Sequence, residues 1–423
     1  MRKGIIVGGG ITGVTVAGNL PFPVVIIEKE GRPGGLLKSF QINGFTFDSD
    51  AHFLHFHSPE MERKVLSKCG DILRRYEKRA GIYFRERLIP FPLQRNLCRL
   101  PPRISTRILS EILIERWGKK GKSESLKEFL VSSYGKTLFH IFFQPYFEKL
   151  FGLDISLIPY KEISRFFPED KVMDILKGFQ NPRVFAVGYN RVFYYPKEGG
   201  IETFFKCWKE NNLNILVGKR VVRIKWEEKT VVLNNGEELI YDFLVSTVPL
   251  KEFLEMAFPK LPYRLKEKLY TNSILCINLG VEGKAETGYH WIYFPEGSFS
   301  FFRVGFYTQI SPTLAPKGHF SLYVELANTS YSNDLLERVI EDLEKVGIIK
   351  KHSQLKAIHP VEIKYAYPLF LGNRNELEEL FSFMEAHDVY LGGRFGSWNY
   401  FSIEDCIKEG EEIAKRIREK CRL

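Results

Sequence analysis

The chain has 423 residues, too many for one ordinary core, so we expect two or three domains. Hydrophobic residues make up 44% and charged residues 26%, a balance that argues against disordered, collagen-like and solenoid classes. The net charge of +10 suits anionic ligands or a membrane surface and is too diffuse to indicate a nucleic-acid partner.

The spacing of the cysteines and the hydropathy of the chain indicate the cellular compartment that we expect for this protein. The six cysteines lie far apart without a C-x-x-C pair, so they indicate neither a disulfide framework nor a zinc site. Scattered thiols suit a reducing compartment. No apolar run reaches the length of a membrane span, and the first apolar run starts too early for a signal peptide. We therefore expect a soluble, cytoplasmic protein without a transmembrane segment.

The first predicted elements form a strand, a glycine-rich turn and a helix. Residues 4–7 are an apolar run typical of a buried parallel strand, residues 8–13 read G-x-G-x-x-G, and a helical stretch follows over 14–20. A second apolar run, 24–27, stops at Glu28. Glycines let the backbone approach a pyrophosphate at the helix N-terminus, and the acid can accept from a ribose hydroxyl. An isolated glycine pattern can be an ordinary turn, but this context predicts a dinucleotide site, with flavin and nicotinamide both open.

The residues after Glu28 favour a flavin. Residues 28–36 read E-K-E-G-R-P-G-G-L, and residues 195–200, 221–224, 241–249 and 391–394 carry further matching pieces. The chain here resembles the flavoprotein superfamily of amine oxidases, protoporphyrinogen oxidases and UDP-galactopyranose mutases, which implies FAD as the cofactor. The resemblance implies cofactor contacts from Gly8, Gly10, Ile11, Thr12, Gly13, Glu28, Lys29, Arg32, Gly35, Leu36, His52, Val222, Gly393, Arg394, Tyr400, Ser402 and Ile403.

The positions of these pieces predict an α/β fold with three parts. A discontinuous Rossmann-type FAD-binding domain would take residues 1–60, 190–250 and 385–423. A mainly helical insert would span 61–185, and an antiparallel-sheet substrate domain would span 251–384. Within the last part we expect strands over 273–279 and 320–326, with a helix over 334–346 between later strands.

Several segments resemble the UDP-galactopyranose mutases more narrowly. They are the F-D-S-D-A-H run at 47–52, the stretches 88–96, 142–152 and 290–304, and the run G-R-F-G-S-W-N-Y at 393–400. The resemblance implies three catalytic residues, His52, Arg165 and Arg303. His52 would lie against the flavin ring, and the two arginines would bind the substrate diphosphate. It implies substrate contacts from Phe91, Gln94, Tyr146, Phe151, Arg165, Asn190, Tyr293, Arg303, Tyr367 and Tyr400.

Each of these segments also has a plainer interpretation. Residues 88–96 could be a proline-stiffened edge strand, the aromatic residues of 142–152 could be helix core, and each arginine could form a structural ion pair. His52, His55 and His57 could suggest a metal, but no partner with suitable spacing accompanies them. The chain also departs from the family at Asp50-Ala51, Phe91, Phe151 and Ile403-Glu404.

The resemblance implies a flavin-dependent mutase that interconverts the pyranose and furanose forms of a nucleotide sugar, with UDP-galactose as the simplest substrate. In that family, N5 of reduced FAD attacks the anomeric carbon, so an external reductant such as NAD(P)H or a reductase is implied, and a homodimer is compatible with it. The alternative is an FAD-dependent oxidoreductase of the amine oxidase or protoporphyrinogen oxidase type. A relative with another sugar or base, or a non-catalytic flavin-binding protein, also stays open.

Overall fold

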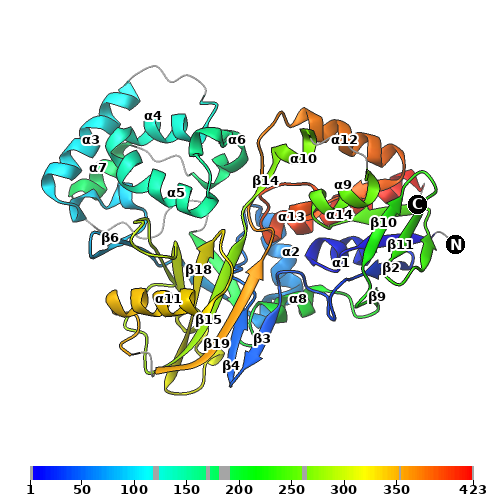
Figure 1. Ribbon diagram of the computed structural model, residues 1–423, viewed down its shortest axis with the longest axis horizontal. Coiled ribbons are helices and arrows are strands. Elements are labelled where there is room, and N and C mark those ends of the chain that lie inside the picture. The colour runs from blue at the N-terminus through cyan, green and yellow to red at the C-terminus, as the bar shows by residue number, and fades with distance from the viewer. Residues whose placement is uncertain are drawn as a thin grey trace.

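The structure is a computed structural model that describes residues 3–117, 123–167, 172–180, 191–259, 264–351 and 354–421. It is a mixed α/β fold with a small parallel sheet on one side, a large sheet below and a group of helices above the large sheet (Figure 1). The predicted fold class, a Rossmann-type part joined to helical and sheet-rich parts, is confirmed.

The parallel sheet has the strand order β21-β13-β1-β2-β9. Its strands are β1 (Gly4–Val7), β2 (Val24–Ile27), β9 (Asn214–Leu216), β13 (Phe243–Ser246) and β21 (Val389–Leu391). The predicted strands 4–7 and 24–27 are confirmed, and both are apolar because helices or loops cover each face of the sheet. Helix α1 (Ile11–Gly18) follows β1 and packs closely on α14 (Ile403–Lys420), where the hydroxyl of Thr12 donates to the carbonyl of Cys406 at 3.1 Å.

The large sheet has the strand order β19-β15-β18-β17-β16-β6-β7. Its strands are β19 (Leu355–Ile363), β15 (Ile274–Glu282), β18 (His319–Ala327), β17 (Arg303–Phe306), β16 (Trp291–Tyr293), β6 (Ala80–Phe84) and β7 (Arg87–Pro90). All neighbours are antiparallel except β16 and β6, which are parallel. Helix α11 (Asn333–Lys345) packs its apolar residues on one face of this sheet. The strands predicted over 273–279 and 320–326 and the helix predicted over 334–346 are confirmed.

The segment expected to be mainly helical contributes to two layers. Its helices are α2 (Pro59–Cys69), α3 (Pro102–Trp117), α4 (Leu126–Leu138), α5 (Gln144–Phe151), α6 (Tyr160–Ile163) and α7 (Val172–Gln180). The same segment supplies β6 and β7, and β7 lies at the edge of the large sheet, as the proline-stiffened interpretation of residues 88–96 expects. The aromatic residues of α5 belong to the core of the helical group, which supports the plainer interpretation of their spacing.

The remaining elements join these layers. They are β3 (Ser39–Ile42), β4 (Phe45–Asp48), β5 (Leu73–Glu77), β8 (Val192–Pro196), α8 (Ile201–Trp208), β10 (Val221–Lys225), β11 (Thr230–Leu233), β12 (Glu238–Ile240), α9 (Leu250–Ala257), α10 (Arg264–Lys268), β14 (Leu269–Thr271), β20 (Pro368–Phe370), α12 (Asn375–Ala386) and α13 (Gly393–Gly396). Among the helices of the described ranges, none is long and apolar enough to cross a bilayer.

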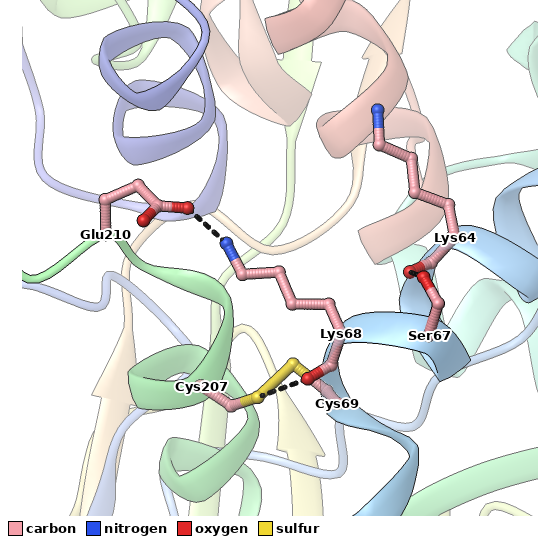
Figure 2. Close-up of a disulfide and its surroundings, with 6 residues drawn as sticks. All are labelled: Lys64, Ser67, Lys68, Cys69, Cys207 and Glu210. Carbon is pink, nitrogen blue, oxygen red and sulfur yellow. Dashed lines mark hydrogen bonds and ion pairs between the residues drawn. A yellow bond between two sulfur atoms is a disulfide. The ribbon is translucent and has the colours of Figure 1, made fainter.

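The cysteines correct one sequence-based expectation. Cys69 at the end of α2 and Cys207 in α8 form a disulfide, with Cα atoms 6.0 Å apart and 138 residues between them in sequence (Figure 2). The expectation of no disulfide was wrong because the packing of α2 on α8, which spacing alone does not reveal, brings the two thiols together. Because two of the six cysteines are joined in this disulfide, the cysteines no longer argue for a reducing compartment.

Candidate active site

The turn between β1 and α1 is shaped to receive a phosphate group. Gly8 has φ of +107°, and a Cβ on Gly13 would lie 2.1 Å from the carbonyl oxygen of Gly8, so both positions require glycine. Gly10 precedes α1 and has nothing within 4 Å of where a Cβ would stand, which leaves its face open. Ile11 and Thr12 begin the helix directly behind this turn. An open helix N-terminus lined by glycine offers backbone N–H donors to an anion.

Glu28 directly follows β2 beside the same turn. Its buried carboxylate accepts from the backbone N–H of Gly9 at 2.8 Å and from that of Glu30 at 2.9 Å. Lys29 is exposed, and the backbone N–H of Lys219 donates to the carbonyl of Glu28. The chain then enters β10, where Val222 is 46% exposed.

Gly34 and Gly35 pack against Gly9 and Gly10 of the turn between β1 and α1. The N–H of Gly34 donates to the carbonyl of Gly9 at 2.9 Å, and Gly35, with φ of +58°, faces the Cα of Gly10. Leu36, next in sequence, is partly buried against the core of the helical group. This arrangement brings the two predicted cofactor segments into direct contact.

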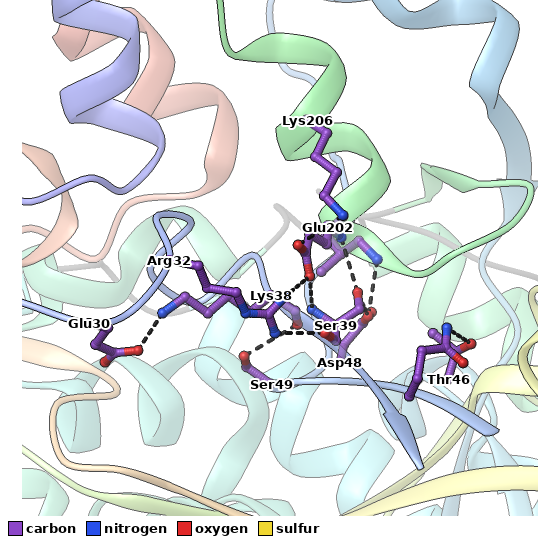
Figure 3. Close-up of polar contacts among 11 residues, drawn as sticks. Glu30, Arg32, Lys38, Ser39, Thr46, Asp48, Ser49, Glu202 and Lys206 are labelled. Atoms are coloured by element: carbon purple, nitrogen blue, oxygen red, sulfur yellow. Dashed lines mark hydrogen bonds and ion pairs between the residues drawn. The ribbon is translucent and has the colours of Figure 1, made fainter. Parts of the chain in front are cut away.

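Arg32 takes a different direction from these glycines. Its guanidinium pairs with the buried carboxylate of Glu202 at 2.5 Å and donates to the carbonyl of Ser39 at 2.8 Å (Figure 3). The neighbouring Lys38 pairs with Glu30. The positive charges of Arg32 and Lys38 are therefore matched by carboxylates of the protein.

The C-terminal motif meets the glycine turn from the other side. Gly393 has φ of +80°, and a Cβ there would lie 3.0 Å from the hydroxyl of Thr12. Arg394 donates to the carbonyls of Ala366 and Phe401, and its guanidinium lies 4.5 Å from the ring centroid of Tyr400. The first turn of α1 and the 393–400 run thus form one continuous surface.

The start of α14 lies next to this surface. Ser402 and Asp405 form a capping box, and Ile403 begins the helix. Nη2 of Arg165 lies 2.5 Å from Oδ2 of Asp405. Burial alone would raise the pKa of Asp405, but hydrogen bonds from Ser402 and Arg165 outweigh it and hold the pKa below its usual range.

Arg303 lies on β17, opposite Glu325 on the neighbouring strand β18. Its Nε and Nη2 donate to the two carboxylate oxygens of Glu325, whose side chain is fully buried. Burial raises the pKa of Glu325 to about 8, against the opposing effect of Arg303. The side chain of Arg303 is 17% exposed, so the protein does not enclose it completely.

Four tyrosines surround Arg303. Tyr367 stacks on Tyr400 with ring centroids 5.1 Å apart, and Tyr293 meets Tyr146 at 5.6 Å. Removal from water raises the pKa of all four, to about 12 for Tyr400. Their hydroxyls therefore stay protonated and can donate hydrogen bonds without adding charge.

His52 faces the same group of charges. Its Nδ1 lies 3.2 Å from the carbonyl of Asp50, and its nearest charges are Asp50, Arg394 and Arg303. Desolvation lowers the pKa of His52, so the ring is neutral near pH 7. A neutral imidazole at this place can accept or donate a hydrogen bond but carries no charge of its own.

The remaining predicted substrate residues extend this pocket toward the helical group. Phe91 lies 5.3 Å from Tyr293, and Phe151 lies 6.2 Å from Tyr367, both measured between ring centroids. Gln94 is buried, 6% exposed, in the turn after β7. The predicted residues Phe91, Tyr146, Phe151, Tyr293, Arg303, Tyr367, Tyr400 and His52 therefore share one region, whereas Arg165 pairs with Asp405 at its border. Asn190 lies outside the described residues.

The structure adds polar residues that sequence reasoning missed. Glu325 is the carboxylate of a buried and mostly apolar strand, a pattern that could have marked it. Lys78 is 8% exposed, with Nζ 4.7 Å from the ring centroid of Phe91, and burial lowers its pKa to about 8. Lys149 donates to the carbonyls of Phe294, Glu296, Phe299 and Phe301, so it holds the loop after β16 in place.

In the parts of the chain that are described, no group of three or more His, Cys, Asp or Glu side chains could hold a metal ion.

The geometry is suited to FAD. The open glycine turn, the buried acid after β2 and the N-termini of α1 and α14 could hold the diphosphate, the adenosine ribose and the flavin in turn. A family model described as flavin containing amine oxidoreductase matches residues 15–418. The chain belongs to this family. The predicted cofactor, FAD, is thereby confirmed for this amine oxidoreductase family member, and so is the predicted resemblance to the amine oxidase superfamily.

Solved structures of the family share the whole fold. A crystal structure of reduced UDP-galactopyranose mutase has a TM-score of 0.92 and 25% identity, covering 99% of this chain and 96% of that chain. A proposed protoporphyrinogen oxidase from an Exiguobacterium species has a TM-score of 0.78 and 17% identity, covering 99% of both chains. Cyclohexylamine oxidase from Brevibacterium oxydans has a TM-score of 0.69 and 16% identity, covering 100% of both chains. The last two likenesses concern the fold alone.

Proposed function

We propose that this flavoprotein is a mutase that interconverts the pyranose and furanose forms of a nucleotide sugar, with UDP-galactose as the first substrate to test. The observation that carries the proposal is the likeness to reduced UDP-galactopyranose mutase over nearly the whole of both chains. The group of one arginine, four tyrosines and a neutral histidine beside the cofactor surface supports it.

In this proposal the protein holds the diphosphate while the sugar reacts. The guanidinium of Arg303 would donate to the diphosphate, because a guanidinium keeps its charge and can pair with two oxygens. Tyr293, Tyr367 and Tyr400 would add neutral donors around the same anion. This arrangement would stabilise the negative charge that develops when the anomeric bond breaks.

The other residues would position the reactants. FAD in its reduced form would supply the nucleophile for the anomeric carbon, so an external electron donor such as NAD(P)H or a reductase would be a partner. His52 would fix the local hydrogen bonds, and Phe91 and Phe151 would exclude water from the pocket. Arg165 would contribute its remaining N–H donors to the diphosphate while Nη2 stays paired with Asp405.

The proposal is tested with the purified holoenzyme. Its flavin is reduced with dithionite, UDP-galactopyranose or UDP-galactofuranose is added, and the two are separated by chromatography. We expect interconversion only in the reduced state. Absence of interconversion with either substrate and with other UDP-sugars would refute the mutase proposal.

A second candidate is an FAD-dependent oxidoreductase of the amine oxidase or protoporphyrinogen oxidase type. It is favoured by the carboxylates that pair with Arg303 and Arg165, since they make the pocket less positive and more tolerant of a cationic substrate. Consumption of oxygen or formation of hydrogen peroxide with an amine or a porphyrinogen, without sugar interconversion, would favour this candidate.

A further inference from the structure

Lys78 is a buried cation that no carboxylate of the described chain balances. It lies between β5 and β6, is 8% exposed, and places its Nζ 4.7 Å from the ring centroid of Phe91. Among the residues that the structure describes, none offers a carboxylate at ion-pair distance from this Nζ or an oxygen that accepts a hydrogen bond from it. Burial lowers its pKa to about 8, so the ammonium is still the main form near about pH 7.

Such a cation is unfavourable for the protein alone. An ammonium that leaves water loses its hydration, and a carboxylate partner normally makes up for that loss. The face of Phe91 attracts the ammonium, but one ring replaces only part of the lost hydration. We therefore expect the missing negative charge to arrive with a ligand.

Lys78 and Arg303 belong to one row of neighbouring side chains. The ring of Phe91 lies 5.3 Å from that of Tyr293, measured between centroids, and Tyr293 on β16 is paired with Arg303 on β17. The two cations differ in their charge balance. Arg303 is already paired with Glu325, whereas Lys78 has no such partner in the described ranges. A ligand held at Arg303 would therefore gain from a second negative group at Lys78.

The direction of the strands shows which end of this row carries Lys78. Strands β6 and β16 run parallel, with Ala80 opposite Trp291. Since Lys78 precedes Ala80, it lies toward the Trp291 end of β16. There Trp291 stacks on Phe53 with ring centroids 5.4 Å apart, and Phe53 directly follows His52. Lys78 is therefore on the side of the row that carries the histidine loop.

The opposite end of the row faces the helical group. Tyr293 meets Tyr146 of α5 there. In the proposed function the sugar reacts beside the flavin, on the side of His52, and the base lies beyond the diphosphate, on the side of Tyr146. Lys78 would thus meet the sugar.

We propose that Lys78 binds a carboxylate on the sugar, so that the substrate of this protein is an acidic nucleotide sugar. The inference rests on the proposed function, which places the diphosphate at Arg303 and the sugar beside the flavin. A carboxylate carries one negative charge, which matches the one charge of Lys78, and it accepts charge-assisted hydrogen bonds from an ammonium. A phosphate on the sugar would bring nearly two negative charges to a single cation.

The test compares UDP-galacturonate with UDP-galactose, which differ only in having a carboxylate or a hydroxymethyl group at one sugar carbon. Calorimetry gives the dissociation constants of both for the oxidised holoenzyme and for Lys78→Met. The wild type should bind UDP-galacturonate about tenfold or more tightly than UDP-galactose, and Lys78→Met should lose this preference. The same ratio of constants in the two proteins would overturn the inference. Equal weakening of both ligands in Lys78→Met would place the diphosphate at Lys78 and would also overturn it.

Two further variants separate the charge from the fold. Lys78→Gln removes the same charge and should lose the preference as well, so a folding defect of one variant does not decide the result. Lys345 on α11 also lies over a phenylalanine, with Nζ 5.5 Å from the ring centroid of Phe299, so Lys345→Met is a matched control that should keep the preference. If UDP binds to none of these proteins, the proposed function and the inference fail together. If UDP binds and the wild type shows no preference for the carboxylate, the inference alone fails.

Discussion

Arg165 pairs with Asp405, the residue that closes the capping box at the start of α14. The turn that follows α6 is thereby tied to a helix whose N-terminus faces the cofactor surface. Since Asp405 also accepts from the N–H and the hydroxyl of Ser402, one carboxylate joins three groups. The pair fixes the position of the Arg165 guanidinium at the start of α14.

The capping box of α14 should matter for both stability and cofactor binding. Ser402→Ala should lower the free energy of unfolding by about 1 kcal/mol, because an N-terminal donor of the helix loses its acceptor. It should also weaken FAD binding several-fold, measured by flavin fluorescence. Ser125→Ala removes the other capping box, at the exposed start of α4, and should cost similar stability while FAD affinity stays unchanged. Equal FAD affinity in both variants would show that the α14 cap does not serve the cofactor.

Arg303→Ala should weaken UDP binding by about tenfold or more while FAD stays bound, because a charge-assisted pair with the diphosphate is lost. Calorimetry on the holoenzyme measures the first quantity and the flavin absorbance of the purified protein measures the second. Arg374 pairs with both carboxylate oxygens of Glu162 outside the tyrosine group, so Arg374→Ala is a matched control. Both variants should lose stability, and only Arg303→Ala should lose affinity for UDP. Unchanged UDP affinity in Arg303→Ala would place the phosphate site elsewhere.

The disulfide should contribute strongly to stability. Because it closes a loop with a sequence separation of 138 residues, replacing Cys69 and Cys207 by serine should cost about 3–5 kcal/mol. Urea unfolding with and without reducing agent measures the effect, and reduction should not destabilise the double variant further. Cys98→Ser, which removes a free thiol, should behave as the wild type does. Labelling of six thiols in the unreduced, unfolded protein would contradict the disulfide.

Stability should fall in acid because of His290. Its ring is 1% exposed, its Nδ1 accepts from the N–H of Arg79 at 3.2 Å, and burial lowers its pKa to about 3. Below about pH 6.5 this histidine therefore binds a proton in the unfolded chain but not in the folded chain. Stability is lost as the pH falls from about 6.5 toward about 3. The slope from this group reaches about 1.4 kcal/mol per pH unit.

The measurement is the pH dependence of the free energy of unfolding. The slope reports the number of protons taken up on unfolding, whereas the packing cost of a substitution changes the free energy by the same amount at every pH. His290→Asn should reduce the slope by one proton, whereas His387→Asn, at the end of α12, should keep it. Identical slopes in the wild type and His290→Asn would mean that this ring does not titrate on unfolding.

Local sequence patterns correctly predicted the elements that depend on neighbouring residues. The run over 4–7, the glycine turn and the run over 24–27 became β1, the start of α1 and β2 because apolar runs and glycines restrict the backbone within a few residues. The roles of His52, Arg303 and the tyrosines were inferred by resemblance and stay predictions, although the structure does bring these residues together.

The residues themselves determined that this chain has a dinucleotide turn and, through its family motifs, that the cofactor is FAD. The three-dimensional packing decided which groups meet: Cys69 with Cys207, Arg165 with Asp405, and Arg303 with Glu325. The physical reason is that a backbone turn is governed by adjacent residues, whereas the charge state of a buried group depends on partners from distant strands. Those partners are known only once the sheets and helices have packed.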